Sequence, residues 1–567
     1  MSFLSKHFGV IILAFFVAVL SFGPQLLAIY KMGDNFQGIY PINTADDIYY
    51  LARSQDIIDG HIFLSNPYLY EHKDSSPMQF WLPDFILAQP MIWLDISPPI
   101  AFIIYDFLLV FILVVLSYLI FYKLTLNRPL ALIFSSFLHL GLFLSDFARS
   151  PSPQFNFIFC LLLFLFLIEY IRKKRKIYLF LASISFGLLF HVYTYYWTFF
   201  VVLFAIFSTA YLLRYKKINW HFLGVFLGAL LIGLPYFFSL FQAMQLPFYE
   251  ESIYRLGMID THFPSGIKIV LLFFIAIISA VFFYKNKIIK INELSIFLIS
   301  SIIAAAISVN QHVITGKNLE FSSHYWMIAV FSFSFLVAYL FNKILQNKIF
   351  GFSKKNVYII LFVVVICFSF WQQKNKVLAD INPNETELYW QNYKPIFDWL
   401  NNNTAKDSVV FANNDLSTLI PVYTKNNIYY NRFANLFFIS DQEVQERFVI
   451  NNYWEEFDDE FIYDKQRSIW GVHYIDAYGH NTSKNILRKF FNLPPQEYEK
   501  IPKQKIDEFV LLAEDIQSGE LSDYLFNYRV DYFVWDKNKN PNWQLDNLDF
   551  LEEVYFYDNF FIYKIIF

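Results

Sequence analysis

The chain carries a succession of apolar segments, each close to the length that crosses a membrane. About twenty apolar residues in a helix span about 30 Å of hydrocarbon. The first segment is too long for a signal-peptide core and has no small-residue cleavage site, so we expect it to be retained. These segments predict a polytopic α-helical membrane protein with about eleven transmembrane helices, at residues 8–30, 98–122, 129–146, 155–171, 177–193, 196–213, 221–241, 267–284, 294–309, 326–342 and 357–371.

The composition fits a membrane protein and excludes both a nucleic-acid-binding protein and a protein built on disulfides or thiolate metal sites. Hydrophobic residues make up 56% of the chain and charged residues only 16%, whereas about a quarter of the residues are charged in a typical soluble protein. The net charge of −4 leaves no basic surplus for nucleic acid. Cys160 and Cys367 both lie in apolar runs, so neither a disulfide framework nor a thiolate metal site is expected.

Lysine and arginine residues gather in alternate short loops, and such loops stay on the cytoplasmic side of a membrane. This bias predicts a cytoplasmic N-terminus and places the loops 31–97, 147–154, 194–195, 242–266 and 310–325 outside. We expect an integral protein of a bacterial or archaeal cell membrane. The cations are Lys6, Lys123, Arg128, the cluster 172–176, Arg214, Lys216, Lys217, Lys285, Lys287, Lys290 and the lysines between 343 and 355.

The aromatic segment His191–Trp197 decides how the apolar stretch 177–213 is divided. A single continuous span would place the two flanking basic clusters on opposite sides of the membrane. Two spans joined by a tight outer turn keep both clusters inside, and we therefore predict two helices.

The composition changes at about Gln372, after which no apolar run approaches twenty residues. We therefore divide the chain into a transmembrane domain, 1–371, and an extracytoplasmic domain, 372–567, which the odd span count places outside. Its β-rich runs alternate with helical stretches, which favours an α/β domain. The predicted strands are 408–412, 531–535 and 554–567, and the predicted helices lie around 392–402, 441–453 and 506–516.

The first outer loop, 31–97, has 67 residues, and loops this long are usually functional. Thr44 followed three residues later by Asp47 is a helix-start pattern, and Gly60 suits a helix end. Apolar residues recur between them at helical spacing, which predicts a helix of about 14 residues. Its first turn carries the adjacent carboxylates Asp46 and Asp47.

Two interpretations of this acidic pair remain open. Carboxylates in a first helical turn are stabilised by unpaired N–H groups and the helix dipole, so both could be simple helix-start residues. Asp47, in the capping-box position, fits that explanation better. Asp46 has no structural role, and adjacent carboxylates at a membrane surface suit a proton acceptor or a divalent-cation ligand. Asp46 is thus the favoured catalytic residue and Asp47 the second candidate.

The layout of this region resembles a known family. After the first span, the loop contains Ala-Asp-Asp-Ile-Tyr-Tyr-Leu-Ala-Arg at 45–53, Asp-Gly-His at 59–61 and Asn-Pro-Tyr at 66–68. This resembles polytopic glycosyltransferases of the GT-C fold, which include protein O-mannosyltransferases, lipid A aminoarabinose transferases and the catalytic subunit of oligosaccharyltransferase. The resemblance implies a polyprenyl-phosphate-linked sugar donor, a first-loop carboxylate that acts as base on the acceptor, and a soluble outer C-terminal domain.

The chain departs from this family at two points. Eleven spans are fewer than the best-known members have, and the C-terminal region has no WWDYG-like acceptor motif of oligosaccharyltransferases. Transfer of an oligosaccharide onto protein is therefore the less expected subclass.

Cationic residues in the outer loops are candidates for binding the donor phosphate or sugar, because a lipid phosphate needs cationic or N–H donors. Each has an alternative explanation. His72 and Lys73 could rest on headgroups, and the loop 310–325 could lie in water. Arg149 could pair with Asp146, and Arg255 could pair with nearby glutamates. The candidates are His72, Lys73, Arg149, Arg255, Lys317 and His324.

Two further acids could join the site. Asp106 lies eight residues into the second span, where ionisable groups are costly and usually functional. Glu320 lies in the loop 310–325. A divalent cation is left open, since no ligand spacing fixes one.

Three classes of function are open to a membrane protein with these features. The leading one is inverting sugar transfer in cell-envelope glycosylation, from a polyprenyl-phosphate-linked donor to a hydroxyl or amine of a lipid, glycan or protein acceptor, with Asp46 as base. The alternative is a transporter or flippase of a lipid-linked glycan or other solute, in which related halves and charges at mid-membrane are typical. An anchored adhesion or scaffold protein would not need eleven helices or so long a first loop.

Overall fold

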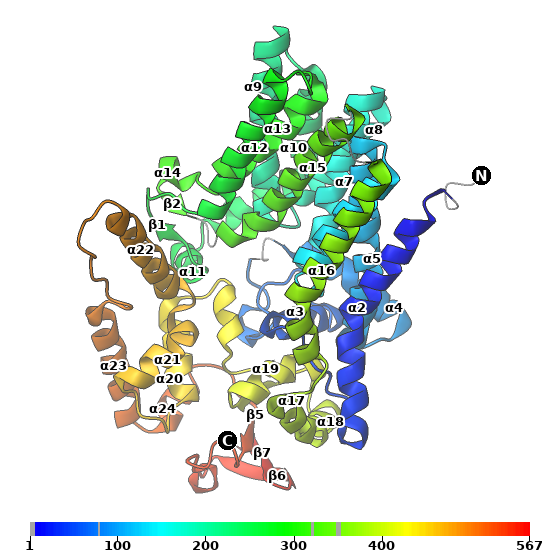
Figure 1. The fold of residues 1–567 in the computed structure, drawn as a ribbon. Helices are drawn as coiled ribbons and strands as arrows, with labels where there is room; N and C mark the ends of the chain where they lie inside the picture. Colours follow the sequence, from blue (N-terminus) through cyan, green and yellow to red (C-terminus); the bar gives the residue numbers. More distant parts are fainter. Residues whose placement is uncertain (1–5, 77–79, 319–321, 348–352, 567) are drawn as a thin grey trace.

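The computed structural model describes residues 6–76, 80–318, 322–347 and 353–566. A bundle of long helices forms one part of the molecule, and a C-terminal α/β domain lies against one end of it (Figure 1). We call that end of the bundle the domain side.

Nine helices in the described part of the chain are long and apolar enough to cross a membrane. The chain is therefore an integral membrane protein. These helices are α2 (Phe8–Met32), α5 (Pro98–Thr125), α7 (Gln154–Lys173), α9 (Thr194–Tyr215), α10 (Trp220–Ala243), α12 (Ile267–Lys285), α13 (Glu293–Ser308), α15 (Trp326–Gln346) and α16 (Lys354–Asp380).

The other two predicted spans are also helical but shorter. One consists of α6 (Arg128–Ser136) and the π-helical turn η3 (Phe137–Leu142), and the other is α8 (Lys176–Leu189). A helix of 14 residues such as α8 is about 21 Å long, so the count of eleven spans stays a prediction. The predicted break is confirmed, because α9 begins at Thr194.

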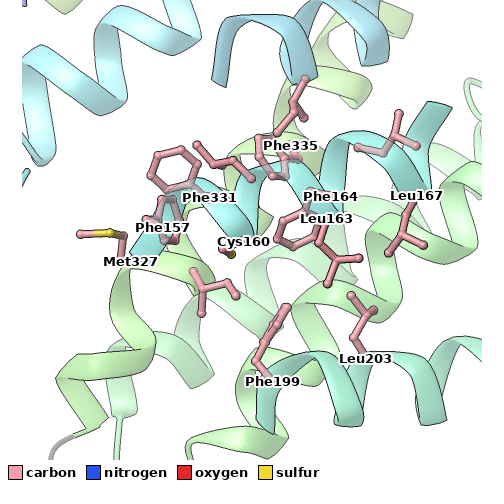
Figure 2. Packing of buried hydrophobic residues seen from close by; sticks show 14 of the residues in the cluster. Phe157, Cys160, Leu163, Phe164, Leu167, Phe199, Leu203, Met327, Phe331 and Phe335 are labelled. Atoms are coloured by element: carbon pink, nitrogen blue, oxygen red, sulfur yellow. The ribbon is translucent and has the colours of Figure 1, made fainter. Parts of the chain in front are cut away.

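Phenylalanine rings fill the centre of the bundle (Figure 2). Phe157 and Phe331 lie 4.8 Å apart, and Phe164 and Phe335 lie 5.3 Å apart, measured between ring centroids. Helices α8 and α10 approach so closely that a Cβ on Gly187 would come within 2.5 Å of Ile232. Small residues allow such close approach between membrane helices.

The first loop confirms the predicted 14-residue helix, α3 (Ala45–Ile58), which begins after Thr44. A second helix, α4 (Trp81–Leu94), was not predicted. A buried ion pair of 2.6 Å between Arg53 and Asp84 joins the two helices. The shorter elements on the domain side are η1 (Gly33–Asn35), η2 (Tyr70–His72), α11 (Tyr249–Arg255), β1 (Ile259–Asp260), α14 (His312–Thr315), β2 (Lys317–Asn318) and η4 (Ser322–Tyr325).

The C-terminal domain is α/β, as predicted. Its sheet has the order β4-β3-β5-β7-β6, in which β3 is parallel to β4 and β5, and β7 is antiparallel to β5 and β6. The strands are β3 (Val409–Ala412), β4 (Asn427–Ile428), β5 (Tyr532–Asp536), β6 (Leu551–Tyr557) and β7 (Phe560–Ile565).

Helices surround this sheet, and the predicted helices around 392–402, 441–453 and 506–516 correspond to α18, α20 and α23. The helical elements are α17 (Glu385–Trp390), η5 (Gln391–Tyr393), α18 (Lys394–Asn403), α19 (Asn414–Tyr423), η6 (Arg432–Leu436), α20 (Asp441–Asn451), α21 (Asp459–Trp470), α22 (His473–Phe490), α23 (Lys503–Ser518), α24 (Leu521–Leu525) and η7 (Leu545–Asn547).

A buried cluster joins the two parts of the molecule through α3. It contains Tyr49 and Leu51 of α3, Phe102 of α5 and Leu416 and Ile420 of α19. Helix α3 therefore lies between the membrane helices and the C-terminal domain, as Figure 1 shows. This packing holds the first turn of α3 at the junction of the two.

Candidate functional site

The exposed carboxylate of Asp46 forms an ion pair across the junction. Its Oδ2 accepts a hydrogen bond from Nη1 of Arg149 at 2.5 Å, and the Asp46 side chain remains 56% exposed. Arg149 also donates from Nε to the carbonyl oxygen of Ser152 at 2.7 Å, which fixes the direction of its guanidinium. The ion pair with Asp146, one of the alternatives drawn from the sequence, is not formed.

Asp47 points into the protein and caps the helix. Its Oδ2 accepts hydrogen bonds from the backbone N–H groups of Asn43 and Thr44, both at 2.8 Å. Burial raises the pKa of Asp47 to about 7, although these N–H donors act in the opposite direction. The helix-start explanation therefore accounts for the position and contacts of Asp47.

Asp106 lies directly behind this cap. Its carboxylate accepts hydrogen bonds from Nε2 of Gln154 at 2.7 Å and from Nδ2 of Asn43 at 3.3 Å. Asp47 and Asp106 line the same small pocket. The pocket extends from the membrane helix α5 to the start of α3, so the structure brings three of the predicted acids to one region.

Aromatic side chains lie on the membrane-domain side of Arg149. Burial acts to lower the pKa of Arg149, but Tyr50, Asp46 and Tyr193 beside it outweigh burial and raise the pKa. The hydroxyl of Tyr193 is hydrogen-bonded to Nδ1 of His324. The His324 ring also stacks on Tyr195 with 4.5 Å between centroids. Two of the candidates predicted from the sequence therefore have Tyr193 as a neighbour: Arg149 through its charge and His324 through a hydrogen bond.

Two arginines of the C-terminal domain, which the sequence analysis did not identify, face the same junction. Arg432 begins η6 and lies over the Phe433 ring, with its Cζ 4.8 Å from the centroid. Burial and the neighbouring Arg467 lower the pKa of Arg432, whereas the charge of Asp46 acts to raise it. The carbonyl of Ser468 in α21 accepts a hydrogen bond from Nδ2 of Asn435 in η6, which holds the two helices side by side.

The side chains of Arg432 and Arg467 both reach solvent, although neighbouring groups partly desolvate Arg432. Within the described residues neither has an ion-pair partner. Two unpaired guanidinium groups near a carboxylate form a region that suits an anion. No local sequence pattern marks them, because their proximity depends on the packing of η6 against α21.

His72 and Lys73 lie away from Asp46. His72 contacts a carboxylate oxygen of Glu443 in the C-terminal domain at 2.9 Å. Lys73 pairs with Asp56 and donates to the carbonyl of Pro67 at 3.0 Å. Asp56 is ten residues beyond Asp46 in α3, about 15 Å along the helix axis.

Arg255 and Lys317 are likewise engaged elsewhere. Arg255 is buried against η6, where it pairs with Asp441 and donates to Oγ of Ser252 at 3.1 Å. Burial lowers its pKa. Lys317 forms an exposed ion pair of 2.8 Å with Asp260. Glu320 lies outside the described residues.

A metal site was left open by the sequence. In the described part of the chain, no group of three or more His, Cys, Asp or Glu side chains is arranged to hold a metal ion. Asp46 is paired with Arg149, and Oδ2 of Asp47 accepts from two N–H groups. We therefore derive no step through a metal ion.

Comparisons with solved structures show a similarity of fold. No family model and no curated protein matches the chain. The chain is similar to the crystal structure of an oligosaccharyltransferase from Archaeoglobus fulgidus, which was tethered through a disulfide bond to an acceptor peptide containing the NVT sequon. The TM-score is 0.46 and the identity 13%, over 94% of this chain and 69% of the other. An identity this low does not indicate a substrate.

Proposed function

We propose that this protein is a glycosyltransferase of the GT-C type that transfers a sugar from a polyprenyl-phosphate-linked donor to an acceptor hydroxyl or amine. The observation that carries this proposal is the ion pair between exposed Asp46 and half-buried Arg149 at the junction between the membrane helices and the C-terminal domain. A lipid-linked donor reaches the junction from the membrane, and the acceptor reaches it from the aqueous side. The orientation that places the domain side outside the cell is part of the proposal.

The reaction is an inverting displacement. The acceptor oxygen or nitrogen attacks the anomeric carbon of the donor on the face opposite the phosphate. Asp46 takes the proton from the acceptor, and the bond between the anomeric carbon and the phosphate oxygen breaks. The phosphate leaves with the electron pair, and nearby guanidinium groups stabilise its negative charge.

Arg149 links donor binding to the activity of Asp46. In the ion pair, Oδ2 of Asp46 accepts a hydrogen bond from Arg149 and is therefore not free to accept a proton from the acceptor. A lipid phosphate competes with Asp46 for the same guanidinium through strong, two-pronged hydrogen bonds. Asp46 is therefore released to accept a proton when the donor is bound.

Arg432 and Arg467 provide a second contact with the donor. Both belong to the C-terminal domain, the charge of Asp46 acts on Arg432, and neither arginine has a carboxylate partner within the described residues. A phosphate group held between Arg149 and this arginine pair would be enclosed by both domains. The C-terminal domain thus completes the donor site.

The test is transfer of radiolabelled sugar from synthetic polyprenyl-phosphate sugars in membranes that contain each variant. We expect Asp46→Asn to abolish transfer, because the amide cannot accept the proton. The matched control is Asp95→Asn, an exposed acid in the same loop with a left-handed backbone that asparagine tolerates. Full transfer by Asp46→Asn in correctly folded protein would refute the proposal. Labelled solute that crosses vesicles without a new glycosidic product would favour a transporter instead.

The same assay tests the arginine pair. Hydrogen bonds to charged groups contribute about 1.5–3 kcal/mol each, so Arg432→Gln should raise the KM for the donor about 10- to 100-fold. Arg175→Gln is the control, because Arg175 is exposed at the opposite end of the bundle. An unchanged KM for the donor would remove Arg432 from the site but would leave the role of Asp46 intact.

A further inference from the structure

The end of α22 and the turn that follows it expose a group of large apolar side chains. Phe490 is 78% exposed, Ile486 71% and Phe491 66%, and Leu487 and Leu493 are also exposed. Ile486 and Phe490 are four residues apart and therefore lie on one face of the helix. A contiguous apolar patch of this kind marks an interaction site.

This segment lies beside the start of a membrane helix. Oγ1 of Thr261 is hydrogen-bonded to Nε2 of His480 at 2.8 Å, and the Phe263 ring contacts the His480 ring with 5.7 Å between centroids. Nζ of Lys484 lies 5.9 Å from the centroid of Phe263. The spanning helix α12 begins at Ile267, only four residues after Phe263. Figure 1 shows α22 beside β1, β2 and α14 on the domain side.

The charge of the segment suits anionic lipid headgroups. Residues 484–493 contain Lys484, Arg488 and Lys489 and no carboxylate. Arg488 donates from Nε to the carbonyl of Pro494 at 2.7 Å, which ties the turn back to the end of the helix. Apolar side chains interspersed with cations are typical of segments that lie in a membrane interface.

We propose that residues 484–493 insert into the lipid leaflet on the domain side. Ile486, Phe490 and Phe491 enter the acyl boundary, and the three cations contact anionic headgroups. Residues 484–493 include none of the residues assigned to sugar transfer, and their insertion into lipid is independent of that activity.

This contact would fix the position of the C-terminal domain above the membrane. Helix α21, which carries Arg467, ends at Trp470, and α22 begins three residues later at His473. The N–H of Val472 donates to the carbonyl of Arg255 at 2.9 Å, so the connection between the two helices is itself anchored to the membrane domain. Lipid insertion of the far end of α22 adds a second anchor.

The experiment uses the full chain in nanodiscs of phosphatidylcholine, alone or mixed with phosphatidylglycerol. Cys367→Ala removes the exposed thiol, and Cys160 is buried. The environment-sensitive fluorophore NBD is then attached at Phe490→Cys, and in the control at Leu511→Cys, which is 65% exposed on α23 of the same domain.

At position 490 we expect blue-shifted emission and several-fold stronger quenching by doxyl-labelled lipid than at position 511. Aqueous iodide should quench the fluorophore at position 511 more strongly than the one at position 490. Combined Lys484→Gln, Arg488→Gln and Lys489→Gln substitutions should weaken the lipid quenching, most strongly in nanodiscs with phosphatidylglycerol. Equal iodide quenching at both positions would overturn the proposal. Protection at position 490 from both quenchers would also overturn it, because a protein surface would then cover the segment.

Discussion

At the scale of single residues, the acidic pair shows how neighbouring carboxylates acquire different roles. Asp46 is exposed and paired with Arg149, whereas Asp47 is 6% exposed and bound to backbone N–H groups. The capping role of Asp47 could be anticipated because a capping box is a pattern of four consecutive residues. The partner of Asp46 could not, because Arg149 is 103 residues away and meets it only through the packing of the bundle.

The pKa of Asp47 leads to a prediction about stability and pH. Its folded pKa of about 7 lies above the ordinary value of 3.8. The folded state therefore favours the protonated form of Asp47. The contribution of this carboxyl group to the free energy of unfolding is complete below about pH 4 and is lost as the pH rises through about 7. We expect the melting temperature of the purified protein to fall across this interval.

The matched variant is Asp47→Asn, which keeps an acceptor oxygen for the N–H groups of Asn43 and Thr44 but does not ionise. The difference in unfolding free energy between variant and native protein should grow with pH, to at most about 4 kcal/mol, since one pKa unit corresponds to about 1.4 kcal/mol. Parallel pH profiles of the two melting temperatures would contradict the prediction.

At the scale of elements, the connection between α21 and α22 depends on one glycine. Gly471 has φ +62°, and a Cβ at this position would lie 2.3 Å from the carbonyl oxygen of Arg255. The same oxygen accepts the hydrogen bond from the N–H of Val472. A side chain on Gly471 would therefore separate the C-terminal domain from α11 at this contact.

We expect Gly471→Ala to destabilise the protein by about 1–3 kcal/mol through backbone strain alone, with additional loss from the displaced hydrogen bond. Thermal unfolding and limited proteolysis between α21 and α22 measure the effect. Gly479→Ala is the control, because it lies in the interior of α22 with open space around it, and replacing a helical glycine by alanine stabilises by about 0.5–1 kcal/mol. Equal stability of the two variants would show that the close approach to Arg255 is not maintained in solution.

Most membrane helices could be predicted because each apolar run defines one helix without reference to its neighbours. Helix α4 could not be, since it has only 14 residues and contains Pro90, and its position depends on the buried pair between Arg53 and Asp84. The cations of the loops were recognisable as cations, but their partners were not. Arg255 anchors the start of α20 because it pairs with Asp441, which is 186 residues away in the sequence.

At the scale of the whole molecule, the two domains share a core. The Phe433 and Phe437 rings of the C-terminal domain lie 5.7 and 5.9 Å from Tyr49 of α3, measured between centroids. Tyr68 of the first loop is fully buried against Phe433. The first loop therefore serves both as the support of Asp46 and as part of the core beneath the C-terminal domain.

This shared core predicts that the C-terminal domain depends on the first loop. Without it, residues 381–567 would expose the apolar face of α19 that Tyr49 and Leu51 cover, and exposed patches of this kind cause aggregation. We expect the fragment 381–567 to be insoluble alone and to be recovered in complex with residues 1–380 when both are produced together. Size-exclusion chromatography and copurification measure this. A soluble, monomeric fragment that unfolds cooperatively would show that the domain carries its own complete core, and Asp46 would then be held at the junction by the membrane helices alone.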